Sequence, residues 1–234
     1  MIAFIPARGD STRFPRKNLA LLDGRPLIEY TIAAAFESGV FNCICVSSED
    51  DEIISLALRY FNENTLLEDR HIMRSVIRQG PRSTVAHHCA QHLDAYAQSD
   101  RHYDTFAVLL PTSPLRTAAD IRSAYDIFTS SRADVCMSLT EFEHQPQWAV
   151  SIGDDGYVVT GPDINRRREE LSKAYRHDGG VIFAKTKPFM RTLDFYAGDV
   201  VPYFIPAERA VDVNTEMDLM FAEFLLKNGD LANA

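Results

Sequence analysis

The chain has 234 residues, of which 46% are hydrophobic and 24% are charged, and its net charge at pH 7 is −9. This composition is typical of a soluble globular protein, and α/β domains of this length often fold as one unit. The acidic balance argues against duplex nucleic acid as a partner, because neutralising phosphates requires a basic surface.

The N-terminus and the hydropathy of the chain argue against export and membrane insertion. The apolar run Ile2 to Pro6 is followed closely by Arg8 and is too short for the hydrophobic region of a secretory signal peptide. No stretch approaches the roughly 18 apolar residues that a membrane-spanning helix needs. We therefore expect a cytoplasmic protein without a membrane partner.

Strand-like and helix-like segments alternate along the chain, which predicts βαβ units and a largely parallel sheet within a single domain, residues 1–234. The residues between 62 and 80 have no clear pattern, although Ile72 to Ile77 is compatible with a strand. The other predicted elements, in chain order, are a strand at Ile2–Ile5, a loop at Pro6–Asn18, a helix at Pro26–Ser38, a strand at Asn42–Ser47, a helix at Asp50–Phe61, a helix at Thr84–Ala97, a strand at Phe106–Leu110, a helix at Ala118–Ser130, strands at Asp134–Leu139, Gly180–Ala184 and Val200–Ile205, and a helix at Thr215–Lys227.

Residues 141–175 depart from this alternation. Trp148 to Ile152 and Tyr157 to Thr160 predict a hairpin around the turn Asp154-Asp155-Gly156. We interpret the region as an excursion from the main sheet and as a candidate dimerisation arm.

The four cysteines, Cys43, Cys45, Cys89 and Cys136, match no common zinc-binding spacing. Cys43 and Cys45 share one face of a predicted strand. We expect all four to be small core residues.

The loop after the first predicted strand is rich in cations. It contains Arg8, Arg13, Arg16 and Lys17, together with Gly9, which lets the backbone approach a phosphate. Loops at the carboxyl ends of parallel strands are where open α/β sheets bind ligands, and several cations there suit a triphosphate. The alternative is a solvated basic loop, and the segment lacks the spacing of a Walker A motif.

The segment from Ile5 to Asn18 resembles the N-terminal signature of acylneuraminate cytidylyltransferases, I-P-A-R-x-x-S-x-x-x-P-x-K-N. The matching residues are Arg8, Ser11, Lys17 and Asn18. The resemblance implies that Arg8 and Lys17 contact the phosphates of CTP and support the leaving pyrophosphate, while Ser11 and Asn18 add polar contacts. The family often has lysine where this chain has Thr12, so one phosphate contact is expected either to be missing or to shift to Arg13.

A second segment, Leu109 to Thr117, resembles the family's L-Q-P-T-S-P-L-R. Thr112, Ser113 and Arg116 match and are implied to contact the sugar, whereas Leu110 replaces the glutamine. On its own, Pro-Thr-Ser-Pro is an ordinary turn.

A third segment, Val211 to Leu219, resembles the family's D-I-D-T-x-x-D. Asp212 and Asn214 point to the same side of an extended segment and are candidate ligands of Mg²⁺, a cation that prefers oxygen ligands. Asn214 replaces an aspartate, and its alternative role is to cap the last helix.

The segment Tyr175 to Phe183 resembles F-R-x-N/D-G-x-x-Y of the family's sugar pocket and makes Arg176 and Asp178 candidate sugar contacts. Arg168 is placed where the family often has an arm arginine, which could pair with a substrate carboxylate. Trp148 replaces a family lysine.

A weaker match covers the nucleobase segment, where Arg78 is expected near cytosine and Ser83 or Thr84 near the sugar.

The resemblance therefore implies a Rossmann-like three-layer α/β sandwich with a mixed, mostly parallel sheet, of the nucleotide-diphosphosugar transferase type, that forms a homodimer through the arm. It implies transfer of CMP from CTP to an acidic sugar such as a sialic, legionaminic or pseudaminic acid, with Mg²⁺ as cofactor and Arg8, Lys17 and Asp212 in catalysis.

Three alternatives stay open. The acceptor could be an octulosonate or a phosphonate, or the chain could bind a nucleotide without turnover because of Asn214. A dinucleotide oxidoreductase is the weakest alternative, since no G-x-G-x-x-G follows the first strand.

Overall fold

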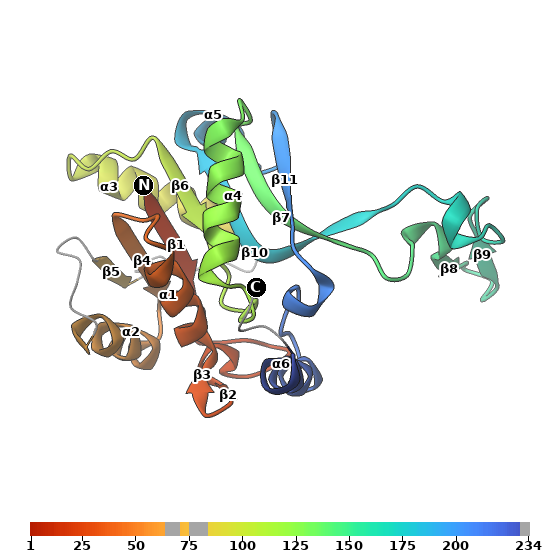
Figure 1. Ribbon diagram of the computed structural model, residues 1–234, viewed down its shortest axis with the longest axis horizontal. Coiled ribbons are helices and arrows are strands. Elements are labelled where there is room, and N and C mark those ends of the chain that lie inside the picture. Colours follow the sequence, from red (N-terminus) through yellow and green to blue (C-terminus); the bar gives the residue numbers. More distant parts are fainter. Residues whose placement is uncertain (64–70, 75–83, 230–234) are drawn as a thin grey trace.

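A mixed seven-stranded sheet lies at the centre of the computed structural model, which describes residues 1–63, 71–74 and 84–229 (Figure 1). Its strands lie in the order β11-β7-β10-β6-β1-β4-β5. Strand β10 is antiparallel to both of its neighbours, whereas the other pairs in the sheet are parallel, which confirms a mixed, mostly parallel sheet. The strands are β1 (Ile2–Pro6), β4 (Cys43–Ser48), β5 (His71–Arg74), β6 (Thr105–Val108), β7 (Val135–Glu141), β10 (Tyr175–Lys185) and β11 (Val200–Phe204).

Side chains of β1 alternate between two hydrophobic clusters, one on each face of the sheet. Ala3 and Ile5 join the cluster covered by α1 (Leu27–Ser38), α2 (Asp51–Glu63) and α4 (Ala118–Ser130). Ile2 and Phe4 join the cluster covered by α3 (Val85–Gln98) and α5 (Thr186–Thr192). The sheet is thus the middle of three layers.

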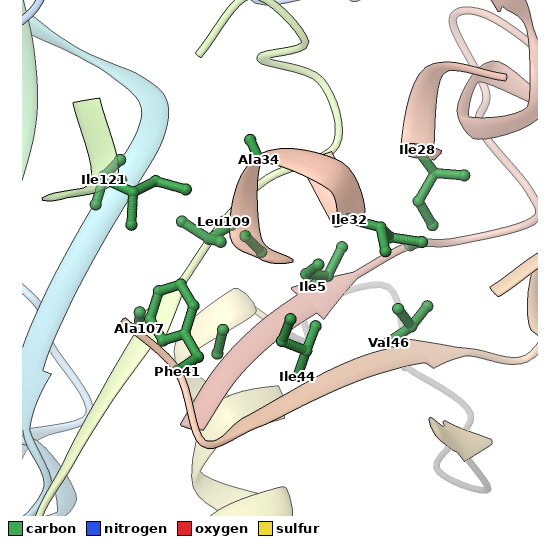
Figure 2. Packing of buried hydrophobic residues seen from close by; sticks show 14 of the residues in the cluster. Ile5, Ile28, Ile32, Ala34, Phe41, Ile44, Val46, Ala107, Leu109 and Ile121 are labelled. Carbon is green, nitrogen blue, oxygen red and sulfur yellow. The ribbon is translucent and has the colours of Figure 1, made fainter. Parts of the chain in front are cut away.

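Helix α1 shows how one of these layers is held. Ile28 and Ile32 point from the helix toward Ile5, Ile44 and Val46 of the sheet, and all five side chains are fully buried (Figure 2). Burying an isoleucine side chain stabilises a fold by about 1.5–3 kcal/mol, so this contact fixes β1, and with it the start of the loop that follows, firmly to α1.

A third, smaller cluster lies under α6 (Glu216–Asn228), where Ala222 packs against Leu22, Leu27, Leu115 and Val213. Leu22 belongs to the short hairpin formed by β2 (Leu21–Leu22) and β3 (Arg25–Pro26), which the sequence did not predict. Asp23 and Gly24 make its two-residue turn with φ of 48° and 76°, as a type I′ hairpin requires. The cluster connects α6 to the loop regions around the carboxyl end of β1.

The segment between β7 and β10 leaves the body of the molecule as an extended arm (Figure 1). At its tip, β8 (Val150–Ile152) pairs with β9 (Val158–Thr160), which confirms the predicted hairpin. Apolar side chains on the hairpin are exposed, including Ile152 at 66% and Tyr157 at 75%.

One predicted element needs adjustment, and one helix was not predicted. Strand β10 begins at Tyr175 rather than Gly180, because its first residues pair with the part of β7 that extends into the arm. Helix α5 was not predicted. All four cysteines are buried and none forms a disulfide, as expected of core residues. Within the described ranges, no helix combines the length and the apolarity needed to cross a membrane.

Candidate active site

The basic loop follows β1, where the order of strands in the sheet changes direction. The next strand of the sheet, β4, pairs with one side of β1, and the later strand β6 pairs with the other side. Such a switch point is the usual ligand-binding position of an open α/β sheet. A cleft of about 510 Å³ opens there. Its lining comes from three segments and comprises Pro6, Arg8, Asp10, Ser11, Thr12, Arg13, Lys17, Asn18, Thr84, Val85, Leu110, Pro111 and Thr112. We call it the basic cleft.

Backbone contacts hold the start of the basic loop. The Ala7 N–H donates to the carbonyl oxygen of Ser47 at 2.8 Å. Asn18, predicted as a nucleotide contact, is buried, and its Nδ2 donates to the carbonyl oxygen of Arg8 at 2.8 Å. Asn18 Oδ1 is buried and has no hydrogen-bond partner in the described part of the chain. Asn18 therefore holds the two ends of the basic loop together.

Gly9 lies against the loop that joins β4 to α2. Its N–H donates to Glu49 Oε1 at 2.7 Å, and a Cβ at this position would lie only 2.5 Å from Asp50 Oδ2. Glycine is thus required for steric reasons. The N–H predicted to bind a phosphate is paired with a carboxylate in this structure.

Lys17 and Arg13 meet the third motif through Asn214. Arg13 Nη2 donates to Asn214 Oδ1 at 2.8 Å, and Lys17 Nζ donates to the same oxygen at 3.1 Å. Asn214 Nδ2 donates in turn to Asp212 Oδ2 at 2.6 Å. Burial lowers the pKa of Lys17, and the nearby charge of Asp212 partly opposes this shift. The amide therefore bridges two cations and one carboxylate.

The alternative prediction, that Asn214 caps the last helix, is wrong, because the next residue is the cap. Thr215 is the N-cap of α6, and its hydroxyl accepts from the Asp218 N–H at 3.3 Å. Asp218 completes the capping box and also accepts from the Asn214 N–H at 2.9 Å. The side chain of Asn214 is thereby left to form the bridge.

Asp212 fits a magnesium site better than Asn214 does. Mg²⁺ is usually held by one or two carboxylates together with substrate phosphates and water, and Asp212 offers a half-buried carboxylate beside the basic cleft. Asn214 directs its oxygen at Lys17 and Arg13 and its nitrogen at Asp212, so it supplies no oxygen on that side. No group of three or more His, Cys, Asp and Glu residues suited to a metal occurs among the described residues.

Two predicted sugar contacts in the second motif, Ser113 and Arg116, are buried in this structure. Ser113 and Arg116 are 0% and 2% exposed. The Ser113 hydroxyl donates to the carbonyl oxygen of Asp178 at 2.8 Å, and Arg116 Nη1 donates to that of Gly180 at 2.7 Å. They hold the loop onto the irregular part of β10, and we assign them to positioning rather than to contact with a sugar. Thr112, in contrast, lines the basic cleft.

Asp178, a third predicted sugar contact, is also buried, at 2% exposure. Neither carboxylate oxygen has a hydrogen-bond partner in the described part of the chain. The charge of Asp178 raises the pKa of the nearby Arg116, but burial dominates and lowers it to about 10, which leaves the guanidinium charged at neutral pH. The nearby Asp178 therefore partly offsets the cost of burying the Arg116 guanidinium.

A second cleft, of about 640 Å³, lies between α6 and the base of the arm. Arg176 lines it and donates to the carbonyl oxygen of Ala210 at 3.1 Å. Asp212 and Asn214 also line it, and Asn214 contacts the cations of the basic cleft on its other side. The Asp212–Asn214 bridge therefore stands between the two clefts, with cations on one side and the arm on the other.

Arg168 lies on the arm, where Nη2 is 3.3 Å from Glu141 Oε1. Lys173, which the sequence analysis did not select, binds Glu141 Oε2 at 2.9 Å. Hydrogen bonds from Lys173 and Arg168 lower the pKa of Glu141. Two cations thus converge on one carboxylate.

Arg78 and Ser83, predicted near the nucleobase and sugar, lie outside the described residues.

The cation-lined cleft is consistent with the protein family that the sequence matches. Residues 2–159 match the family model of cytidylyltransferases. The chain belongs to the cytidylyltransferase family. It is therefore an enzyme, a CTP-dependent nucleotidyltransferase.

Relatives of this cytidylyltransferase align over nearly its whole length. Pseudaminic acid cytidylyltransferase of Campylobacter jejuni is 30% identical over 97% of this chain and 96% of the relative. CMP-N,N'-diacetyllegionaminic acid synthase of Legionella pneumophila is 29% identical over 97% of this chain and 96% of its own length. N-acylneuraminate cytidylyltransferase of Streptococcus agalactiae is 30% identical over 94% of this chain and 51% of its own length.

Two solved structures share the fold of the cytidylyltransferase. CMP:2-keto-3-deoxy-manno-octonic acid synthetase, complexed with CTP, has a TM-score of 0.65 and 15% identity, over 97% of this chain and 98% of its own. 4-diphosphocytidyl-2C-methyl-D-erythritol synthase from Anaerococcus prevotii has a TM-score of 0.68 and 14% identity, with the same coverage. These matches confirm the predicted Rossmann-like nucleotidyltransferase fold.

Sequence reasoning missed a buried polar cluster of the cytidylyltransferase, beside the basic loop. Nε2 of His88 and of His92 each lie 2.8 Å from Ser47 Oγ and 3.1 Å from each other. Burial lowers the pKa of His88 to about 4, with a further contribution from the charge of Arg8. The i, i+4 spacing of the two histidines on a predicted helix is a signal that they share a face, but not that Ser47 meets them.

Proposed function

We propose that the enzyme transfers CMP from CTP to the anomeric hydroxyl of a sialic-acid-like 3-deoxy-2-keto sugar acid and releases pyrophosphate. The position of the Asp212–Asn214 bridge between the basic cleft and the second cleft carries this proposal. The triphosphate belongs in the basic cleft and the sugar acid in the second cleft, so that the α-phosphate and the hydroxyl meet at Asp212.

In this scheme, catalysis rests on positioning and on neutralising charge. Arg8, Arg13 and Lys17 bind the phosphates and stabilise the negative charge that grows on the departing pyrophosphate. Asp212 would hold Mg²⁺, which supplies further charge neutralisation when bound. Because triphosphate oxygens compete for Lys17 and Arg13, binding of CTP is expected to free the oxygen of Asn214.

The family relatives support a nonulosonic acid as acceptor, since the printed names of three of them include pseudaminic, legionaminic and acylneuraminic acids. Leu110 lines the basic cleft where the resembled family has glutamine, and half-exposed Trp148 replaces a lysine on the arm. Arg168 and Arg176 remain the exposed cations suited to an acidic acceptor. An octulosonate or a phosphonate acceptor is the second candidate, because the resemblance assigns both replaced positions to the sugar.

We also propose a homodimer that works in the cytoplasm, where CTP is available. The hairpin at the tip of the arm supports this, since it extends away from the body with Ile152, Tyr157 and Val158 exposed at 66%, 75% and 60% (Figure 1). Such a surface needs a partner to bury it. Light scattering of Ile152→Asp against wild type tests the proposal: a monomeric variant supports it, and a monomeric wild type contradicts it.

The activity is tested by measuring pyrophosphate release with each of the four NTPs and Mg²⁺, against a panel of 2-keto sugar acids that includes an octulosonate. Release with CTP and one nonulosonic acid is the expected result. Release with the octulosonate alone would favour the second candidate. CTP binding without release for any acid would favour a nucleotide-binding protein without turnover.

A further inference from the structure

Asp120 lies near the start of α4, and its carboxylate lines neither the basic cleft nor the second cleft. Its side chain is 1% exposed. Arg209 donates to both carboxylate oxygens, from Nη2 to Oδ1 at 2.8 Å and from Nε to Oδ2 at 3.1 Å. The Tyr203 hydroxyl donates to Oδ1 at 2.6 Å, and the Thr117 N–H donates to Oδ2 at 2.8 Å. One buried carboxylate therefore joins α4, β11 and the turn Ala207–Arg209.

Capping of α4 does not account for these contacts. Helix α6 begins with the same capping box, in which Asp218 accepts from Thr215 and stays partly exposed. A capping box needs only the bond to the N-cap residue, which Thr117 already provides for Asp120. Burying an arginine–carboxylate pair costs desolvation energy, so the pair with Arg209 is unlike an ordinary surface cap.

The pair connects the two segments that meet at the candidate site. The loop that carries Thr112 leads directly into α4, and Arg209 lies three residues before Asp212. At the site itself, the Val213 N–H donates to the carbonyl oxygen of Thr112 at 2.7 Å. The spacing between these segments is thus fixed at two points, one at the site and one behind it at Asp120.

We propose that Asp120 and Arg209 are positioning residues that set where Asp212 lies relative to Thr112 and the basic loop. The inference rests on the function proposed above, because Asp212 acts there. A bidentate pair fixes both the distance and the rotation of the turn, which a single hydrogen bond does not. A displacement of about 1 Å at a reacting group can lower a rate about 100-fold, so a small loss of register has a large effect.

The first variant is Arg209→Lys, which keeps the positive charge and loses the bidentate contact with Asp120. We expect kcat to fall about 10- to 100-fold while CTP affinity measured without Mg²⁺ changes less than about twofold, because the basic loop stays in place. The matched control is Phe128→Leu, which trims a buried side chain at the other end of α4. This control should lose thermal stability without losing kcat.

A second variant separates positioning from stability. Asp120→Asn combined with Arg209→Met removes both buried charges and keeps an oxygen for the cap, so it should be more stable than Arg209→Met alone. We expect stability to return while kcat stays at least about tenfold below that of the wild type. Recovery of kcat together with stability would overturn the proposal.

A binding measurement separates this inference from the proposed function. The measured quantity is the ratio of CTP affinity with Mg²⁺ to CTP affinity without Mg²⁺, and measuring it requires no catalytic turnover. We expect the ratio to fall about fivefold or more in Arg209→Lys and to stay at the wild-type value in Phe128→Leu. An unchanged ratio in Arg209→Lys contradicts the positioning role. A wild-type enzyme that releases no pyrophosphate contradicts the proposed function, and the ratio then decides this inference.

Discussion

Lys17 Nζ lies 3.1 Å from Asn214 Oδ1, so the basic loop near the N-terminus is bonded directly to the segment that starts the last helix. Arg13 shares the same oxygen at 2.8 Å. The contact ties the candidate phosphate-binding cations to Asp212 through a single amide. Since an amide is neutral, the bridge holds the cations without neutralising them, which leaves their charge available to a triphosphate.

Replacing Asn214 with aspartate tests the metal site. Asn214→Asp puts a second carboxylate beside Asp212, and two oxygen-donor carboxylates hold Mg²⁺ more tightly than one. We expect the Mg²⁺ concentration for half-maximal pyrophosphate release to fall about three- to tenfold. Mg²⁺ should also stabilise the CTP-free variant more than it stabilises the wild type, as measured by thermal unfolding.

The control for that change is Asn228→Asp at the exposed end of α6, which adds the same charge away from the clefts. Its Mg²⁺ dependence should equal that of the wild type. If Asn214→Asp also leaves the Mg²⁺ dependence unchanged, position 214 contributes no ligand to the metal.

The pH dependence of CTP binding should report on Lys17. Burial lowers its pKa below the ordinary value of 10.5, so the ammonium loses its proton at a lower pH than that of an exposed lysine. The triphosphate binds the charged form, and kcat/KM for CTP is therefore expected to fall as pH rises through this lowered pKa. A pH profile between 7 and about 11 measures the break.

Lys17→Arg supplies the comparison, because a guanidinium stays charged throughout that range. The break should then disappear, even if the overall rate is lower. A break at the same pH in wild type and variant would show that another group titrates.

Glu49 offers a different test of the basic loop. Its carboxylate occupies the Gly9 N–H at 2.7 Å, the donor that a phosphate would use. Glu49→Gln weakens this internal competitor and removes a negative charge, so we expect CTP to bind about three- to tenfold more tightly in calorimetry without Mg²⁺. Glu63→Gln, at the far end of α2, controls for the change in net charge. Weaker binding by Glu49→Gln would mean that the carboxylate supports the loop instead.

Local pattern was enough to predict much of this fold. A continuous apolar run placed β1, and the Pro26 and Gly39 boundaries placed α1 within one residue at its start. The hairpin of β2 and β3 was missed because each strand has only two residues, too few to show a period. Its Asp23-Gly24 turn was the one available signal.

The candidate site was harder to predict because its side chains meet over long sequence distances. The resemblance selected Ser113 and Arg116 by type, but their burial depends on the irregular pairing of β10, which no local pattern encodes. The direction in which Asn214 points depends on Arg13 and Lys17, some 200 residues earlier. Sequence reasoning therefore found the motifs and the loops, and the structure determined which atoms face one another.

The buried histidines predict how stability depends on pH. Burial lowers the pKa of His88 and of His92 to about 4, below their ordinary value of 6.5. The unfolded chain therefore binds more protons than the folded chain between those values, so stability should fall as pH drops from about 6.5 toward 4 and level off below it. The loss is expected to be about 2–3 kcal/mol for each histidine that becomes protonated, measured by urea unfolding at pH 7.5 and at pH 4.5.

His92→Gln should reduce this acid-dependent loss, because glutamine keeps a hydrogen-bonding group near Ser47 and cannot be protonated in this range. His102→Gln, a change at an exposed histidine, is the control and should leave the pH dependence as it is in the wild type. If His92→Gln loses as much stability on acidification as the wild type, protonation of this cluster is not the cause.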